Sequence, residues 1–398
     1  RPIEIKRLQH EGRAFFHLRD HLALSGSDLL VPVELAPVLM LLDGEHDLAR
    51  IRARALLEFG LPLAPAELLQ VIERLDEALM LEGERAEAAM AAALAEFRAA
   101  ASRPPSHAGR VYPADPAALT ELLSAYELRS GATPLPAEQV AGVLSPHIDY
   151  TRGGPVYARG WRQAAEAVRA AQRVIVLGTD HVGSGGALTL TRQAYATPWG
   201  AFARDEPLQE ALAQALGPEA AFAEELHHRS EHSIELASVW LHHVRGGEPL
   251  ALTALLCGHP GPLLRDGLEA NERLRAALEV LRGAVAEGAL VVVAGDLAHV
   301  GPAFGDPLPF GAAERADVRA ADEKLIAACP GGATAVLAEA ARIDDRYRVC
   351  GLSPLALALA IMPPVRLEVA AYDQCPADEA NGSFVSIAAG CFVRAAGS

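Results

Sequence analysis

Short apolar runs alternate with amphipathic stretches from about residue 102 to the end of the chain. The apolar runs are rich in Val, Ile and Leu, are bounded by Gly, Pro or polar residues, and have the length of buried strands. They occupy residues 140–145, 173–178, 187–191, 249–256, 289–295 and 385–393. The stretches between them have helical spacing and include residues 155–171, 205–216, 233–244, 265–287 and 312–328. This alternation predicts an α/β sheet that helices cover on both faces.

The first hundred residues have a different pattern. Apolar residues recur there at helical spacing in "LAPVLMLLDGEHDLARIRARALLEF" and "PAELLQVIERLDEALMLEG", and little of the region alternates as a strand does. Two prolines in "SRPPSH" (102–107) then interrupt the helical pattern and mark a boundary. We therefore expect a small, mainly helical module of winged-helix type at residues 1–101 and an α/β domain at residues 102–398.

The composition narrows the classes of partner. Hydrophobic residues make up 51% of the 398 residues, and the chain carries 35 Lys and Arg against 51 Asp and Glu, a formal charge of −16. A surface this acidic repels phosphate backbones, so we expect no nucleic-acid partner. Because residues 1–100 contain 11 Lys and Arg against 17 Asp and Glu, we expect the N-terminal module to contact a protein or peptide.

The sequence lacks membrane-spanning, signal-peptide and CxxC patterns, and this bears on the location of the protein and on the role of its cysteines. No apolar run reaches the roughly 18–20 residues of a membrane span, and the start of the chain lacks a signal-peptide pattern, so we expect a cytoplasmic protein with no membrane partner. Five cysteines without a CxxC pair argue against a disulfide framework or a structural zinc site. Cys257 and Cys391 fall in or after strand-like runs and Cys329 in a loop. Cys350 differs, because it precedes a glycine and an apolar helix, where backbone N–H groups favour the thiolate.

Three of the predicted strands end in polar clusters that contain histidine. These clusters read "VLSPHIDY", "VIVLGTDHVGSGG" and "VVVAGDLAHVG", and they contribute His147, His181, Asp296 and His299. Loops at the carboxyl ends of strands in an open α/β sheet converge on one crevice. A single histidine there is usually structural, but three at equivalent positions predict a shared site.

Histidine is a common ligand for zinc, iron, copper and nickel, and a ligating ring normally donates its other N–H to a carboxylate or carbonyl. Asp149, Asp180 and Asp296 are candidates for that acceptor. No pair has HExxH spacing, so the ligands must come from separate loops. In "EHSIEL", His232 opens a predicted helix, and it either lines the same site or is structural.

Eight short motifs follow one another between residues 108 and 394. They read "AGRVYPAD", "SPHIDYTRGG", "LGTDH", "EHSIEL", "GDLAHVG", "VCGLSPL", "YD" and "SFVSIAAGCF". Their order resembles that of the Memo family, which in bacteria and archaea is called AmmeMemoRadiSam system protein B. The resemblance covers nearly three quarters of the chain.

This resemblance implies an α/β fold similar to that of the class III extradiol ring-cleaving dioxygenases. By motif it implies metal ligands at His147, His181 and Cys350. His299 takes the place of the acid/base histidine, with Asp296 beside it. Those dioxygenases complete an iron site with a carboxylate where this chain has a cysteine, so ring cleavage does not carry over. A soft thiolate shifts the preference toward copper, and the implied cofactor is copper or iron.

The family name also implies partners, a radical-SAM protein and an AMMECR1-type protein. The first hundred residues resemble the small recognition domains of radical-SAM peptide-modification systems. Our leading interpretation is a metal-dependent redox protein. One alternative is a non-catalytic module that binds a peptide or protein in the dioxygenase-like pocket. Another is a hydrolase or dioxygenase that acts on a small aromatic or carbonyl substrate, and the sequence does not separate the three.

Overall fold

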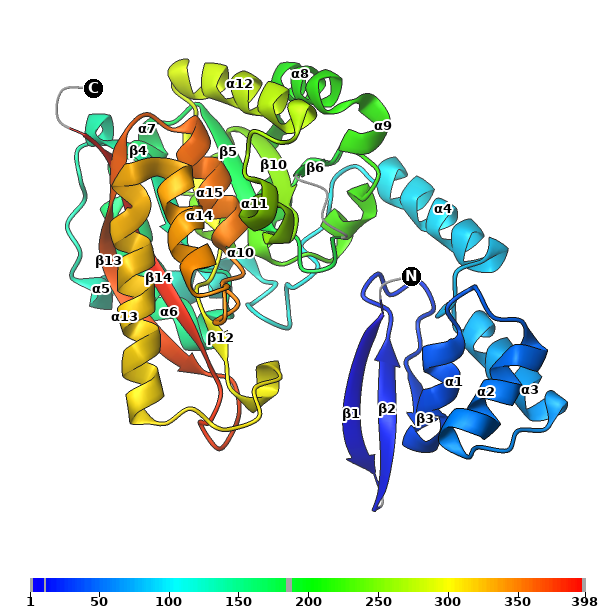
Figure 1. Ribbon diagram of the computed structural model, residues 1–398. Coiled ribbons are helices and arrows are strands. Elements are labelled where there is room, and N and C mark those ends of the chain that lie inside the picture. Colours follow the sequence, from blue (N-terminus) through cyan, green and yellow to red (C-terminus); the bar gives the residue numbers. More distant parts are fainter. Residues whose placement is uncertain (1–2, 11, 184–187, 396–398) are drawn as a thin grey trace. The chain divides into compact units, whose positions relative to one another are not determined.

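The chain forms two compact units, Arg1–Ala99 and Ala100–Ser398 (Figure 1). The computed structural model describes residues 3–10, 12–183 and 188–395. The division falls close to the predicted boundary between residues 101 and 102. Arg103 is fully buried within the second unit, so the proline-rich stretch belongs to that unit's structure and is not a free linker.

The first unit combines a three-stranded antiparallel sheet with helices. Its strands are β1 (Glu4–His10), β2 (Arg13–Arg19) and β3 (Leu29–Pro32), in the order β1-β2-β3. Its helices are α1 (Ala36–Leu41), α2 (Leu48–Phe59), α3 (Pro65–Glu77) and α4 (Glu84–Ala99). The expectation of little strand structure is therefore wrong for this region. Phe16 and Leu18, two residues apart on β2, both pack into a cluster with Leu75 and Met80, and this period of two was the missed signal.

The second unit is built on one mixed sheet whose order is β12-β14-β4-β11-β5-β10-β6. Strands β4 (Val140–Ser145), β11 (Leu290–Ala294), β5 (Arg173–Thr179) and β10 (Ala251–Cys257) are parallel neighbours. Strand β14 (Phe384–Arg394) runs antiparallel to β4 and also pairs with β13 (Val365–Pro376) and β12 (His299–Val300). Strands β6 (Leu188–Leu190) and β9 (Ala203–Arg204) pair with β10, while β7 (Ala196–Thr197) and β8 (Gly200–Ala201) pair separately.

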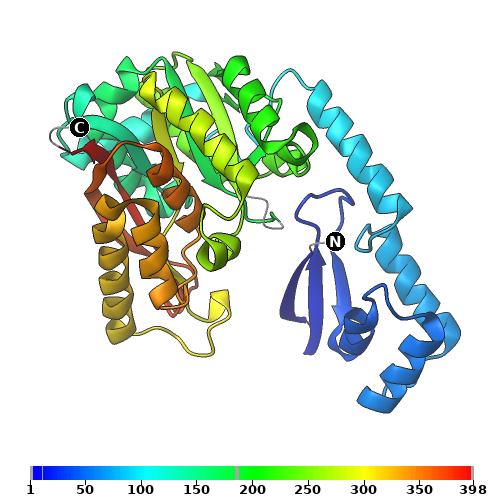
Figure 2. The same ribbon diagram turned by 45° about the horizontal axis from the view of Figure 1, so that its top comes forward.

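Helices cover both faces of this sheet (Figures 1 and 2). On β5, Ile175 and Leu177 belong to one hydrophobic cluster, while the intervening Val174 and Val176 belong to the other. The first cluster includes residues of α8 (Glu206–Leu216), α12 (Glu272–Ala286), α14 (Gly332–Arg342) and α15 (Leu352–Ile361). The second includes residues of α5 (Pro116–Ser130), α6 (Tyr150–Gln163), α7 (Ala165–Ala170) and α10 (Ser233–Val244). The predicted α/β architecture is confirmed.

Details of the prediction differ from the structure in several places. The stretch 265–287 forms two helices, α11 (Gly261–Asp266) and α12, which separate at Gly267, where φ is +72°. Strand β13 was not predicted, because its half-exposed residues do not form a continuous apolar run. The predicted strand 187–191 corresponds to β6, and its first residue lies outside the described residues. Among the helices of the described ranges, none has the length and apolarity to cross a membrane.

Candidate metal centre

Three side chains from separate loops meet near the carboxyl ends of the central strands. His147 follows β4, His181 follows β5, and Cys350 directly precedes the turn into α15. Each offers a ligand atom, and these atoms all lie within 4.8 Å of one another. The Sγ of Cys350 is 3.1 Å from Nε2 of His147. Two imidazoles and a thiol are thus close enough to bind a single ion.

His147 is almost completely buried, and its ring is held by the end of β11. Its Nδ1 lies 3.2 Å from the carbonyl oxygen of Ala294. Because a carbonyl can only accept, Nδ1 carries the proton and Nε2 keeps its lone pair toward Cys350. Burial, and then the neighbouring His181 and His232, lower the pKa of His147 well below its ordinary value. The ring is therefore neutral, which is the ligating form.

His181 is held by a carboxylate. Its Nδ1 lies 3.0 and 3.1 Å from the two carboxylate oxygens of Glu231, and its main-chain N donates to the same group. Burial alone would lower the pKa of His181, but the Glu231 charge and the Cys350 thiol raise it. Burial raises the pKa of Glu231, but the nearby His181 and His232 outweigh this effect and hold the pKa of the carboxyl well below its usual range. Glu231 thus fixes Nδ1 as the donor, and a cation bound at Nε2 of His181 would have to replace the proton there.

The sequence did not identify Glu231 as this acceptor and proposed aspartates instead. Asp149 caps α6 and pairs with Arg152, with 2.6 Å from Oδ2 to the Nε of Arg152. Asp180 accepts from Nδ1 of His227 at 2.8 Å. Neither receives a proton from a ring of the three-residue cluster, so the expected role of these two aspartates is wrong. The tertiary fold determines which carboxylate a histidine ring contacts, and here Glu231 lies 50 residues from His181 in the sequence.

His232 also lies at the site. Its ring stacks on that of His181 with centroids 4.7 Å apart and lies 5.1 Å from the ring of His147. Its Nδ1 is 3.2 Å from Glu231, so the same carboxylate orients both rings. His181, Glu231 and His232 form a second group whose ligand atoms lie within 4.8 Å of one another. Of the two interpretations of His232, the geometry favours the one in which it lines the site.

Asp296 connects the loops that carry the other residues. Its Oδ1 accepts from the main-chain N of His147 at 2.8 Å, and its carbonyl oxygen accepts from Gly351 N at 2.9 Å. Its Oδ2 is 3.7 Å from Nε2 of His147. Burial raises the pKa of Asp296 to about 6. We expected Asp296 beside the acid/base histidine His299, and the structure shows that it contacts His147 directly.

His299 is not one of the three members of the cluster, but the charge of His181 acts on its ring. Its Nδ1 lies 3.1 Å from the carbonyl oxygen of Leu297, so Nδ1 carries the proton and Nε2 the lone pair. Its ring packs edge-on against Phe304, with centroids 5.1 Å apart. Burial lowers the pKa of His299 to about 4, so the ring is neutral at neutral pH.

Two glycines let the Asp296 and Cys350 loops approach closely. A Cβ on Gly295 would lie 2.6 Å from the Cα of Gly351, and a Cβ on Gly351 would lie 2.7 Å from the carbonyl oxygen of Asp296. Side chains at these positions would push the two loops apart. The glycines in "GDLAH" and "VCG" therefore bring Cys350 to the histidines.

A buried ion pair supports the histidine loop from behind. Arg103 pairs with Glu235 and donates to the carbonyl oxygens of Glu231 at 2.7 Å and of His228 at 2.8 Å. Glu235 also accepts from the Tyr112 hydroxyl at 2.5 Å. The sequence did not indicate this network, because Arg103 stands among prolines and polar residues.

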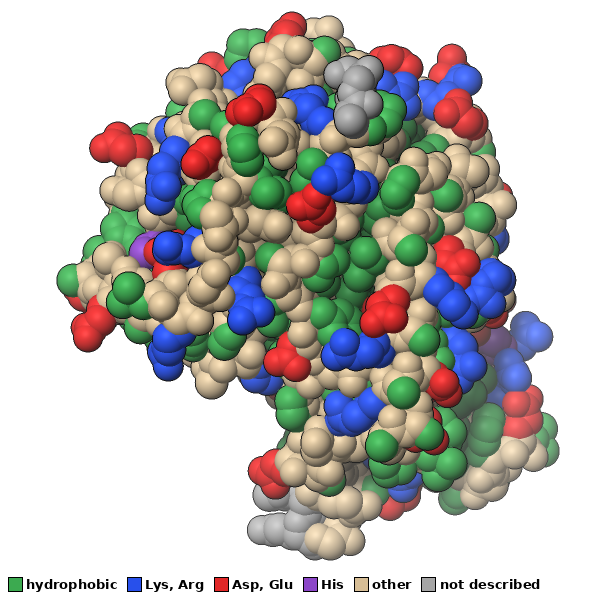
Figure 3. All heavy atoms as spheres, turned by 90° about the vertical axis from the view of Figure 1, so that its left-hand side faces the viewer, with side chains coloured by type: hydrophobic (Ala, Val, Ile, Leu, Met, Phe, Trp, Pro, Cys, Tyr) green, Lys and Arg blue, Asp and Glu red, His purple; other side chains and the backbone are tan. Residues whose placement is uncertain are grey.

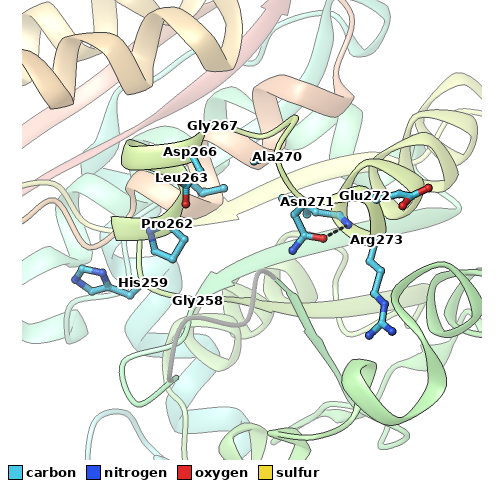
Figure 4. A pocket seen from close by; sticks show the side chains of 11 residues that line it. Gly258, His259, Pro262, Leu263, Asp266, Gly267, Ala270, Asn271, Glu272 and Arg273 are labelled. Carbon is cyan, nitrogen blue, oxygen red and sulfur yellow. Dashed lines mark hydrogen bonds between the residues drawn. The ribbon is translucent and has the colours of Figure 1, made fainter.

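The other cysteines and cavities lie apart from the cluster. Cys257, Cys329, Cys375 and Cys391 are buried and free, while Cys350 is partly exposed. A pocket of about 480 Å³ beyond β10 is lined by His259, Asp266, Arg273 and their neighbours (Figure 4). None of the clustered residues lines that pocket, so the candidate centre is defined by its side chains and not by this hollow.

Comparison with known proteins places this arrangement in a family. The model of the Memo-like protein family matches residues 103–391. A MEMO1 family protein of Thermus thermophilus is 31% identical over 301 residues, which cover 74% of this chain and 86% of the relative. One of Methanopyrus kandleri is 28% identical over 264 residues, which cover 64% of this chain and 84% of the relative. The predicted resemblance is confirmed, and the chain belongs to the Memo family.

Proposed function

We propose that this protein is a metal-dependent redox protein in which His147, His181 and Cys350 bind copper or iron. One observation carries the proposal: the ligand atoms of these three residues lie within 4.8 Å of one another. The Nδ1 atoms of both rings already have oxygen acceptors, which leaves Nε2 for an ion. The relatives carry only a family name, so the activity rests on this geometry.

The donor set suits a thiophilic transition metal. Imidazole nitrogen binds copper and iron, and a thiolate selects for the softer ions. Burial raises the pKa of the Cys350 thiol, so a cation is needed to deprotonate it at neutral pH. Three protein donors also leave a coordination position for a reactant. When bound, such an ion supplies electron transfer and Lewis acidity.

The residues around the donors are suited to hold and move protons. His299 has a neutral ring whose Nδ1–H is fixed on Leu297, so its Nε2 can accept a proton from a reactant and return it. His232 is oriented in the same way by Glu231. Asp296 holds the His147 and Cys350 loops together, because its side chain accepts from His147 N and its carbonyl oxygen accepts from Gly351 N. We assign His299 as the general acid/base and His232 as a second polar group that contacts the reactant.

The proposed function also includes protein partners. We infer cooperation with a radical-SAM protein and an AMMECR1-type protein from the resemblance of the motifs to the Memo family. The N-terminal unit lies outside the matched residues 103–391 and, as a winged-helix-type module, would provide a contact for such a partner.

The proposal is tested by elemental analysis after incubation with Cu(I) or Fe(II) and removal of excess metal. We expect about one ion per chain in the native protein and loss of that ion in Cys350→Ser. Cys375→Ser is the matched control, because Cys375 is a buried cysteine outside the cluster, and it should keep the ion. Equal metal content in all three proteins, or none in any, would refute the proposed centre.

A further inference from the structure

Strand β13 has an unpaired edge. It pairs with β14 along its whole length, from Val365 opposite Arg394 to Pro376 opposite Phe384. Within the described ranges β13 has no second neighbour in the sheet. Its outer N–H and C=O groups are therefore available to another extended chain. At 12 residues, the strand is also longer than most edge strands that proteins leave uncovered.

A groove runs along each face of this edge. One, of about 310 Å³, lies between β13 and helices α5 and α6 and is lined by residues that include Tyr126, Val156 and Ala371. The other, of about 340 Å³, lies between β13 and α13 (Ala312–Ala328). Tyr372 belongs to both grooves. Figure 3 shows this side of the molecule, where apolar side chains at the centre are surrounded by both basic and acidic ones.

The side chains of β13 reach both grooves, those of its first half the groove beside α13 and those of its second half mainly the groove beside α6. Leu367 and Tyr372 pack against the hydrophobic cluster on the α13 side, whereas Ala371 packs against the cluster on the α6 side. A β-bulge between Val369 and Ala371 separates the two halves of the strand. Val369 is 38% exposed and lines the groove beside α13. An added strand would place alternate side chains in the two grooves while its main chain pairs with β13.

The charges at the grooves are opposite to those of the chain as a whole. Arg129, Arg159, Arg319 and Arg366 line them, against Glu323 and Asp373, and Arg366 is also paired with Glu368 of the same strand. The whole chain has 35 basic residues against 51 acidic ones. A second copy of β13 would bring a second set of these arginines to the same edge, which like-charge repulsion disfavours. The excess of arginine therefore favours an acidic occupant.

From these observations we propose that β13 is a docking site for an extended, acidic segment of a partner protein, which adds to the sheet as a further strand. Main-chain hydrogen bonds to the free edge hold the segment, and its apolar side chains fill the grooves. Acidic side chains of the segment face the arginines of the groove walls. The site is independent of the proposed metal centre.

The test is a selection from a random peptide library, with peptides of about eight residues displayed on phage. The full chain is the target, and the Val369→Asp variant removes peptides that bind elsewhere. We expect the enriched sequences to combine apolar residues at both odd and even positions, which reach the two grooves, with Asp or Glu. Each selected peptide should bind Val369→Asp and Arg319→Glu at least about tenfold more weakly than the native chain, and binding should weaken with salt. The control Leu308→Asp changes an exposed residue that lines neither groove, and it should bind normally.

Hydrogen exchange with a selected peptide should show slower exchange of the β13 amides. No enrichment, basic or helically patterned sequences, or equal binding by Val369→Asp would overturn the proposal. So would a native chain that is dimeric in solution and becomes monomeric in Val369→Asp, because a second copy would then cover the strand. Metal content should be unchanged in every variant, which keeps this test separate from that of the metal centre.

Discussion

Nε2 of His147 lies 3.1 Å from Sγ of Cys350, although 203 residues separate them in the chain. The contact depends on the close approach of the Asp296 and Cys350 loops, which only glycine permits at positions 295 and 351. A small change behind the thiol should therefore disrupt the centre without touching a ligand.

We expect Gly351→Ala to weaken metal binding by about tenfold or more, because its Cβ would lie 2.7 Å from the carbonyl oxygen of Asp296 and displace Cys350. A competition titration with a chelator measures the affinity. Gly283→Ala is the control, since a Cβ at Gly283 meets nothing within 4 Å and the residue lies within α12. Equal affinities of the two variants would show that the loop approach does not position the thiol.

His299→Ala should separate catalysis from metal binding. We expect it to retain the ion and to slow oxygen- or peroxide-dependent turnover by about 10²–10⁴-fold, because His299 lies outside the ligand cluster and is held as a neutral base. Metal analysis and a turnover assay on the same sample measure both. His259→Ala, which removes an exposed imidazole elsewhere, should change neither. If His299→Ala loses metal, His299 is a ligand, and undiminished turnover would make it structural.

The boundary between the two units can be tested with two fragments. Residues 100–398 should fold and unfold cooperatively, because the fragment keeps Arg103. Residues 108–398 should be less stable by about 3–5 kcal/mol or fail to fold, since Glu235 would remain buried without its cation. Urea unfolding measures the difference. Equal stability of the two fragments would show that Arg103 is dispensable.

Acid should destabilise the second unit through His228. Burial lowers the pKa of this side chain to about 4, from 6.5 for the exposed group, and its Nδ1 accepts from the Tyr195 hydroxyl at 2.7 Å. Between these values the unfolded chain binds more protons, so stability is complete above about pH 6.5 and falls toward pH 4. The slope of the unfolding free energy against pH is about 1.4 kcal/mol per pH unit for one proton.

His228→Gln should flatten the pH dependence of urea unfolding by about one proton. The exposed control His259→Gln should leave it unchanged, and identical slopes of the two variants would contradict the role of His228.

The strands that carry the site were predictable, because their burial on both faces gives continuous apolar runs. Strand β4 occupies the predicted residues 140–145. Histidines that follow such strands must meet at one sheet edge, so the sequence also indicated which residues gather there. Strand β13 lacks this signal, because one of its edges and much of its surface are exposed.

The supporting contacts were not predictable from local pattern. Glu231 and Arg103 are each paired with side chains far along the chain, and nothing in their neighbourhoods distinguishes them from surface charges. Adjacency of a carboxylate and a histidine in sequence is a poor guide, because Asp180 contacts His227 and not the adjacent His181, whereas Glu231 does contact the adjacent His232. Only the packed fold decides which carboxylate a ring contacts.

X-ray absorption spectroscopy of the metal-loaded protein tests the central claim most directly. We expect one sulfur at about 2.3 Å from the ion and two imidazole nitrogens at about 2.0–2.1 Å. In Cys350→Ser the sulfur contribution should disappear, and in His147→Ala one nitrogen should be lost. A spectrum with only oxygen and nitrogen neighbours in the native protein, or a sulfur signal that persists in Cys350→Ser, would contradict a centre built from His147, His181 and Cys350.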